Sequence, residues 1–475
     1  MKKYLVLFGA AILMMALASP AVAQFSSWGH MEIQTIWERQ PDFNTGRPWQ
    51  IDSVTGPIDR DEVWKNVAQR YRFFLQYGDP KTVRAIIGFE ADSTDWGQLA
   101  NTSGTVGGGG MGVYRADQVQ LEIKVAYLDF VIPNTPLSIA AGIQNFYIGG
   151  RMWMNNDAPG IQLTANFAPH KIMGFWWREQ DVVTSTNTGA SNRNTYSVND
   201  TYGAVWDMSQ QKFNLMAFGA YKNDLYTGNI AAVTNKYDDH PWWLGVGGGF
   251  RPGNWNFSGE VIYVGGKREF SGAGLSDSDY SAYAAEAAAK YQIGPGMFVG
   301  LEGFYSSGQD ADKTDKIGIY QVPTGSEGQS IFGNDRTVFF WMNAAQIGYY
   351  HERNLAFMGM WYGRANFEYS PAAWVRLNFN YLYIGDTTKG TPGTGVSAFT
   401  KVSGTKVVNS PIGARTDKNE DFVGHEINLI TTFNIYKNFV YNVGIYYFLP
   451  GDVYDQANKS ADNSYGINTK LNYAF

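Results

Sequence analysis

The chain of 475 residues contains no cysteine. An exported protein of this length therefore has no disulfide bond to stabilise it, and enzymes that use a cysteine nucleophile are excluded. A continuous wall of hydrogen-bonded β-strands can supply the missing stability.

Long apolar runs are also scarce. After the first residues no stretch reaches the roughly 18 apolar residues that indicate a transmembrane helix. At the start, Lys2 and Lys3 precede an apolar run from Tyr4 to Leu17, and the small residues Ala21-Val22-Ala23 follow. This order predicts a secretory signal peptide over residues 1–23, which leaves a single domain over residues 24–475. A membrane anchor is the alternative, but the run is shorter than the roughly 20 residues of a spanning helix.

Basic residues do not outnumber acidic residues in this chain. Lys and Arg number 37 against 43 Asp and Glu, which gives a net charge of −6 and argues against a nucleic-acid partner. The five histidines lack metal-ligand spacing and no G-x-S-x-G motif occurs, so we expect no metal, no cofactor and no enzymatic activity. Asp310, Asp312 and Asp315 could bind calcium, but without EF-hand spacing a solvated loop is favoured.

Aromatic residues and glycine are abundant. The chain has 54 Gly, 30 Tyr, 29 Phe and 15 Trp, yet its mean hydropathy is −0.28. This mixture suits a wall that is apolar outside and wet inside. It also suits a soluble β-sandwich or an extracellular lectin, which is the competing class.

Alternation with a period of two runs through most of the chain. In the last twelve residues, Tyr465, Ile467 and Leu471 fall on one side of the predicted strand, while Asn468 and Lys470 fall on the other. The same pattern recurs from Trp28 onward. The mature chain therefore reads as all-β, although the pattern alone does not say whether the apolar side faces a core or lipid.

The connections between predicted strands alternate between tight turns and long loops. Asp181 to Asp200, Gly308 to Arg336 and Gly385 to Glu420 are examples of the long loops. We place eight tight turns at Gly78 to Lys81, Pro133 to Pro136, Ala168 to His170, Ser209 to Gln211, Arg251 to Asn254, Gly294 to Gly296, Tyr369 to Pro371 and Tyr436 to Asn438.

Eight hairpins with a first and a last strand give eighteen strands. A β-sandwich offers no reason for every second connection to be long, whereas a transmembrane antiparallel β-barrel has short periplasmic turns and long extracellular loops. The alanine-rich segment Ala284 to Tyr291 could form a helix, and the count would then be sixteen.

Aromatic residues near predicted strand ends indicate the girdles at the two membrane interfaces. They are Trp37, Tyr77, Tyr127, Trp177, Tyr221, Trp255, Tyr291, Tyr383 and Tyr441.

Charged residues are predicted on the inner face, because an Arg or Lys facing lipid at midplane costs about 2 to 4 kcal/mol. Arg70, Arg72 and Arg84 come from neighbouring strands and could form one basic patch, although a solvated wall without selectivity is an equal alternative. Acids share this face, including Glu32, Glu260, Glu286 and Glu426. The candidate pore-lining residues are Arg70, Arg72, Arg84, Glu90, Glu122, Lys124, Arg151, Asp157, Arg178, Glu302, Arg364 and Arg376.

The connection from Asn145 to Gly160 is the predicted constriction, an inward-folded loop near residues 145–160. It combines flexible Gly149 and Gly150 with Arg151, Trp153 and Asp157. An eighteen-stranded cylinder is wide, so a loop that folds inward would narrow it. The alternative is that the loop lies on the rim.

Two stretches carry a resemblance to known proteins. The Gly142 to Gly150 stretch and the Gly424 to Asn428 strand resemble the homotrimeric outer-membrane porins of sulfate-reducing bacteria, and the resemblance runs along nearly the whole mature chain. The Glu426 strand followed by Phe448 to Asp452 is similar to the ending of eighteen-stranded channels of the alginate-export type. The terminal Phe475, with Tyr473 two residues before it, is similar to the signal by which bacterial barrels are recognised for insertion.

The resemblance implies a homotrimer in the Gram-negative outer membrane that lets small hydrophilic solutes and ions diffuse passively, with membrane lipid as its other partner. The mixture of charge signs on the inner face favours a general porin of this kind. The alternatives are a solute-specific channel and a non-conducting surface or structural barrel.

Overall fold

The structure is a computed structural model that describes residues 25–39, 63–96, 121–150, 152–186, 193–226, 237–270, 276–310, 313, 315–323, 336–338, 359–387, 401–403, 406–408, 421–451 and 462–475. The predicted signal peptide over residues 1–23 lies outside the described residues. No helix in the described ranges is long and apolar enough to cross a membrane.

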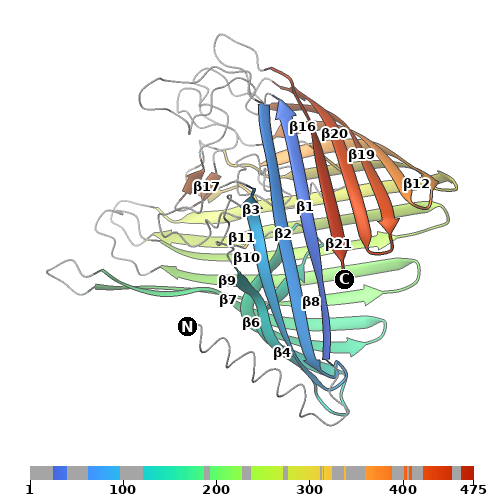
Figure 1. The fold of residues 1–475 in the computed structure, drawn as a ribbon. Helices are drawn as coiled ribbons and strands as arrows, with labels where there is room; N and C mark the ends of the chain where they lie inside the picture. Colours follow the sequence, from blue (N-terminus) through green and yellow to red (C-terminus); the bar gives the residue numbers. More distant parts are fainter. Residues whose placement is uncertain are drawn as a thin grey trace.

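Eighteen long strands make up the wall (Figure 1). They are β1 (Phe25–Arg39), β2 (Val63–Gly78), β3 (Val83–Asp95), β4 (Glu122–Val131), β5 (Leu137–Ile148), β6 (Met154–Phe167), β7 (His170–Thr186), β8 (Arg193–Ser209), β9 (Phe213–Tyr226), β10 (Tyr237–Phe250), β11 (Trp255–Phe270), β12 (Ser278–Gly294), β13 (Met297–Ser306), β15 (Met360–Ala372), β16 (Val375–Asp386), β19 (Phe422–Tyr436), β20 (Phe439–Pro450) and β21 (Ser464–Ala474). Three short strands lie in the connections: β14 (Lys316–Ile317), β17 (Lys401–Ser403) and β18 (Lys406–Val408).

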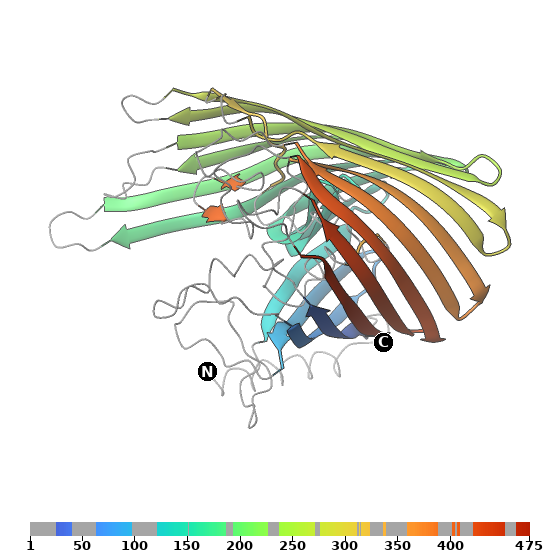
Figure 2. The same cartoon turned by 90° about the horizontal axis from the view of Figure 1, so that it is seen from above.

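The wall closes on itself. Each long strand pairs antiparallel with the next, and β21 pairs with β1, where Leu471 lies opposite Ile33. The terminal Phe475 completes this seam, because its backbone N–H donates to the carbonyl oxygen of Gly29 and its own backbone oxygen accepts from the Gly29 N–H, both at 3.0 Å. In Figure 2 the blue and red ends of the colour range meet along the seam. The predicted eighteen-stranded antiparallel barrel is therefore confirmed.

The alanine-rich segment Ala284 to Tyr291 is strand, as predicted, and lies within β12. Its backbone pairs on both sides, so that Ala285 lies opposite Val261 of β11 and opposite Tyr305 of β13. Sheet pairing overrides the high helix propensity of alanine, because a helix here would leave two neighbouring strands unpaired. The sixteen-strand alternative is wrong.

All eight short hairpin connections are present, and one of them is displaced. The turn between β15 and β16 lies at Ala373-Trp374, whereas Tyr369 to Pro371 belongs to β15. The β15–β16 register shifts between Tyr369 and Ala372. Pro371 therefore sits at an irregularity near a strand end, where a missing backbone N–H costs little.

The two faces of the wall differ in chemistry. Apolar side chains on the outer face are exposed, for example Leu301 at 68% and Leu244 at 56%, while charged residues such as Glu90 at 2% and Glu426 at 0% are buried on the inner face. The predicted girdle residues Tyr77, Tyr221, Trp255 and Tyr383 lie outside with 38 to 43% exposure.

Two predicted girdle residues lie inside instead. Lys124 is the extra residue where the β3–β4 register shifts, and beyond it Leu128 and Phe130 are exposed outside, so Tyr127 faces inward. A bulge of this kind exchanges the two faces of a strand. Trp177 is fully buried inside, in phase with Phe175. The run Ile172 to Trp177 holds no polar residue, so nothing in its sequence marked the inner side.

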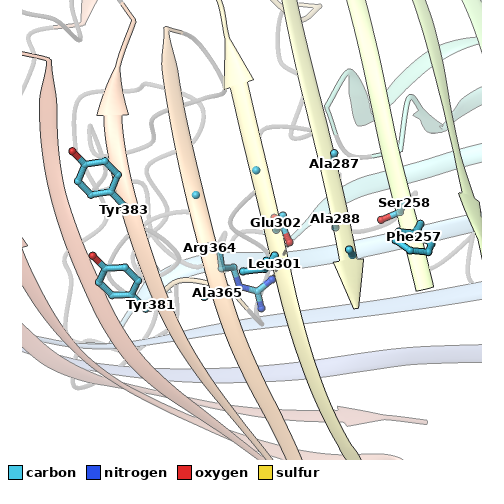
Figure 3. Close-up of a pocket in the computed structure, with 13 residues that line it drawn as sticks. Phe257, Ser258, Ala287, Ala288, Leu301, Glu302, Arg364, Ala365, Tyr381 and Tyr383 are labelled. Atoms are coloured by element: carbon cyan, nitrogen blue, oxygen red, sulfur yellow. Dashed lines mark hydrogen bonds and ion pairs between the residues drawn. The ribbon is translucent and has the colours of Figure 1, made fainter. Parts of the chain in front are cut away.

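A shallow groove of about 590 Å³ runs across the outer face from β11 to β16 (Figure 3). Tyr381 and Tyr383 border one side, Phe257 borders the other, and small residues such as Ala287 and Ala365 lie between them. This groove belongs to the apolar side of the wall and not to the interior.

Candidate functional site

The barrel interior is the candidate site, and one part of its wall is lined by ion pairs. At the centre of that part is Glu90 of β3, whose carboxylate lies 3.0 Å from Arg70, 2.7 Å from Arg72 and 2.7 Å from Lys124. Lys124 also lies 2.8 Å from Asp157 of β6. A single buried carboxylate of β3 thus pairs with cations from β2 and β4, the strands on either side of it.

The ion-paired wall continues across the seam of the barrel. Lys470 of β21 lies 2.8 Å from Glu32 of β1, and Gln34 donates a hydrogen bond of 3.1 Å to Asn468. Along this wall four cations face three carboxylates, which leaves a local charge of +1. Its members are Lys470, Arg70, Arg72 and Lys124 on one side and Glu32, Glu90 and Asp157 on the other. Closer to the short turns, Arg84 pairs with Asp129 at 2.7 Å.

A second feature is a short segment of the β13–β15 connection that lies inside the barrel. This segment, Arg336-Thr337-Val338, is called the internal strap. Its residues are 7%, 0% and 0% exposed. Arg336 pairs with Glu286 of β12 at 3.0 Å and with Glu302 of β13 at 2.7 Å.

The other end of the internal strap is held by β19. The carboxylate of Glu426 accepts hydrogen bonds from the Thr337 hydroxyl and, at 2.6 Å, from the Val338 backbone N–H. The Asn428 side chain donates to the Arg336 carbonyl oxygen at 2.9 Å. The internal strap therefore follows the inner face of the wall from β12 to β19.

A third feature is an aromatic cluster around the β5–β6 turn. Trp153 is fully buried, and its ring centroid lies 4.8 Å from that of Phe218, 5.6 Å from Trp243, 5.7 Å from Trp177 and 6.1 Å from Phe175. These partners come from β7, β9 and β10, so the turn folds into the barrel and fills part of its cross-section.

The β13–β15 connection joins the aromatic cluster to the rest of the interior. The Tyr320 hydroxyl donates to the Met152 carbonyl oxygen at 2.7 Å, and Trp243 Nε1 donates to the Gln321 carbonyl oxygen at 2.9 Å. The same connection thus contacts the β5–β6 turn and β10, and its later residues form the internal strap.

The predicted loop over residues 145–160 is mostly wall. Asn145 to Ile148 belong to β5 and Met154 to Gly160 belong to β6, with Asn145 paired opposite Asp157. Only the short turn between the two strands enters the interior. The prediction of a loop failed because Phe146, Ile148, Met154 and Ala158 continue a period of two that glycines and asparagines obscured. Arg151 lies outside the described residues.

Arg178 was predicted inside and lies outside. It forms a two-point ion pair with Asp200 at 2.8 and 3.0 Å, and Asp200 also accepts a hydrogen bond from Tyr202, which is 45% exposed on the outer face. Alternation from Trp177, which lies inside, places Arg178 outside and Glu179 inside, where Glu179 pairs with Lys222 at 2.7 Å. The charged side chain that faces the interior is therefore that of Glu179, and not that of the neighbouring Arg178, which was predicted there.

The remaining predicted residues fall into two groups. Glu302 and Arg364 are buried together on the inner face, 2.9 Å apart, and Arg364 also donates to Asn380. Glu122 at the start of β4 and Arg376 near the β15–β16 turn are exposed. Their contribution to a pore stays a prediction.

The internal strap was not predicted from the sequence. It lies in a long connection, between a polar stretch and the apolar run Phe339-Phe340-Trp341-Met342, and nothing in Arg336-Thr337-Val338 itself marks it as an interior segment. Its partners Glu286 and Glu426 were expected on the inner face. In the part of the chain that the structure describes, no group of three or more His, Asp or Glu side chains is placed to hold a metal ion, and Asp312 lies outside that part.

No protein-family model and no curated protein sequence matches the chain. Solved barrels from Pseudomonas aeruginosa are similar in structure. OpdK, solved with vanillate, covers 95% of this chain and 98% of its own at 10% identity with a TM-score of 0.51. OccK9 (OpdG) gives the same coverage at 12% identity with a TM-score of 0.51, and OccK8 (OprE) gives it at 10% identity with a TM-score of 0.50.

The chain has the fold of these OccK barrels. At such low identity the similarity concerns the fold only, and it says nothing about the side chains that line the interior of this barrel. The predicted relation to porins of sulfate-reducing bacteria stays a prediction.

Proposed function

We propose that the protein is a porin of the bacterial outer membrane, with a water-filled interior through which small hydrophilic solutes and ions diffuse passively. The observation that carries this proposal is a closed barrel with an apolar outer face and ion pairs on the inner face. Charged side chains are tolerated where they meet water, and an exposed apolar face is tolerated where it meets lipid. The predicted secretory signal over residues 1–23 is consistent with this location.

The ion pairs favour general diffusion over recognition of one solute. Glu90 neutralises bases on its own wall, and the acids Glu286 and Glu302 are neutralised by Arg336 on the internal strap. Rings of one charge sign give a pore strong selectivity, and paired charges give it little. The Trp153 turn and the internal strap narrow the passage, which excludes larger solutes.

The proposal has three further parts: a homotrimer, no enzymatic activity and no nucleic-acid partner. The alanines 285, 287 and 289 make the outer face of β12 flat, which suits contact with a second barrel in a homotrimer. On a gel, an oligomer that dissociates only after heating would support the trimer. A monomer in mild detergent would contradict it. The lack of cysteine and of a G-x-S-x-G motif in the sequence supports a protein that is not an enzyme, and the net charge of −6 supports a protein without a nucleic-acid partner.

Conductance in a planar lipid bilayer tests the proposed function. The purified protein should insert and produce discrete current steps that rise linearly with voltage in potassium chloride. Steps that one solute blocks at low concentration would favour the solute-specific channel. The absence of any conductance after verified insertion would favour a non-conducting surface barrel.

A further inference from the structure

The position of Arg336 shows how the internal strap controls charge in the interior. Its guanidinium group lies 3.0 Å from Glu286 Oε1 and 2.7 Å from Glu302 Oε1, and the side chain is almost fully buried. Glu302 has a second cationic partner in Arg364 at 2.9 Å. Arg336 is therefore the cation that bridges Glu286 of β12 and Glu302 of β13.

The local charge depends on this one residue. Glu286, Glu302 and Glu426, with Glu260 directly opposite Glu286, contribute four negative charges, and Arg336 and Arg364 contribute two positive charges, so the group carries −2. Replacement of Arg336 by a neutral residue leaves −3. Because Arg336 belongs to a connection and not to the wall, its charge can be removed while the sheet pairing of all eighteen strands stays intact.

The barrel wall provides a seat that fixes the strap. Glu426 accepts the Val338 N–H and the Thr337 hydroxyl, as described above. Opposite Val338 lies Gly444 of β20, where an added Cβ would stand 2.9 Å and 3.0 Å from the two Val338 methyl carbons. Since side chains rarely approach this closely, the glycine leaves the space that Val338 occupies.

We propose that Arg336 determines the ion selectivity of this channel, and that Glu426 and Gly444 seat the internal strap so that Arg336 stays between Glu286 and Glu302. In this arrangement Arg336 limits the negative charge next to β12, β13 and β19 and lets anions as well as cations pass. The inference rests on the proposed function, because it names the residue that sets selectivity in the same channel.

The test is the reversal potential of the purified protein in a planar lipid bilayer, measured across a gradient of potassium chloride. Arg336→Gln should favour potassium over chloride about fourfold more than the wild type does. This is about twofold for each ion, as expected for one unit charge about 10 Å from an ion in water. Arg336→Lys should stay near the wild type. Lys313→Gln is the matched control, because Lys313 lies in the same connection, is 61% exposed and pairs only weakly with Asp310 at 3.3 Å.

A second variant tests the seat without removing a charge. Gly444→Ala should displace Val338 and move Arg336 away from its two acids, so that the preference for potassium rises. Gly363→Ala is the control, because an added Cβ there meets nothing within 4 Å. If Gly444→Ala and Gly363→Ala have the same reversal potential, the proposed seat is overturned. This test does not need Arg336→Gln to assemble.

The outcomes separate this inference from the function on which it rests. A wild-type protein that inserts and stays silent contradicts the proposed porin function. A wild-type protein that conducts, together with an Arg336→Gln reversal potential equal to that of Lys313→Gln, contradicts only the role of Arg336.

Discussion

Removal of the Glu90 carboxylate should destabilise the barrel and shift its selectivity toward anions. Glu90 is 2% exposed, and its side chain lies within 3.0 Å of Arg70, Arg72 and Lys124. In Glu90→Gln the volume is kept, but the amide no longer neutralises the three cations. The ion-paired wall then carries +2 in place of +1.

The magnitude follows from burial. Breaking a buried ion pair by removing one partner costs about 3 to 5 kcal/mol, because the remaining charge is left uncompensated. Arg72 and Lys124 are 16% and 17% exposed, and Lys124 keeps Asp157 as a partner. We therefore expect a loss of unfolding free energy near the lower limit, about 3 kcal/mol.

The assay is urea unfolding of the protein in lipid vesicles, followed by the gel mobility of the folded barrel. Glu269→Gln makes the same chemical change at an exposed position of β11 and is the control. In the double variant Arg72→Gln/Glu90→Gln part of the loss should be recovered, because one uncompensated cation is removed. A Glu90→Gln protein as stable as Glu269→Gln would show that the three contacts do not hold this wall together.

Three further changes have defined outcomes. Trp153→Ala removes a side chain that four aromatic rings surround. It should raise the single-channel conductance and lower the free energy of urea unfolding by about 3 to 5 kcal/mol. Tyr147→Ala on the outer face is the control and should leave the conductance unchanged. Phe475→Ala removes a ring that stacks on Tyr71 across the seam and should lower the yield of folded barrel in vesicles, with unchanged yield as the contradicting result. Leu301→Arg places a charge on the outer face and should cost about 2 to 4 kcal/mol in vesicles, and a neutral effect would show that this position meets water.

The barrel itself could be predicted from the sequence because its signals are local and repeated. The period of two and the eight short turns recur along the whole chain, and together they fixed the number of strands. The segment from Ala284 to Tyr291 shows why repetition matters. Its composition favours a helix, but the alternating run and turn that follow it required a strand, and β12 is a strand.

The direction of individual side chains was harder to predict, because one bulge reverses all residues beyond it. Tyr127 faces inward because of the irregularity at Lys124, and the bulged stretch Ile123 to Val125 contains no glycine or proline to mark it. Arg178 faces outward because its neighbour Trp177, which was predicted outside, lies inside. Where apolar residues are consecutive, as in Phe175-Trp176-Trp177, alternation contains no information about the two faces.

Partners across the barrel could not be predicted, because they depend on register and on loops. Arg70, Arg72 and Arg84 were expected as one basic patch, but Glu90 neutralises the first two and Asp129 pairs with the third. The internal strap depends on contacts between residues about 90 positions apart, such as Thr337 and Glu426. No local pattern encodes such a contact.

The central claim is that hydrocarbon surrounds the outer face of this wall while water fills the interior. Because the chain has no cysteine, a single introduced cysteine can report on its own surroundings. In vesicles, a water-soluble thiol reagent should modify Arg72→Cys and reduce the conductance, but it should leave Leu301→Cys unmodified although Leu301 is 68% exposed in the isolated barrel. Modification of Leu301→Cys, with Arg72→Cys protected, would contradict the account.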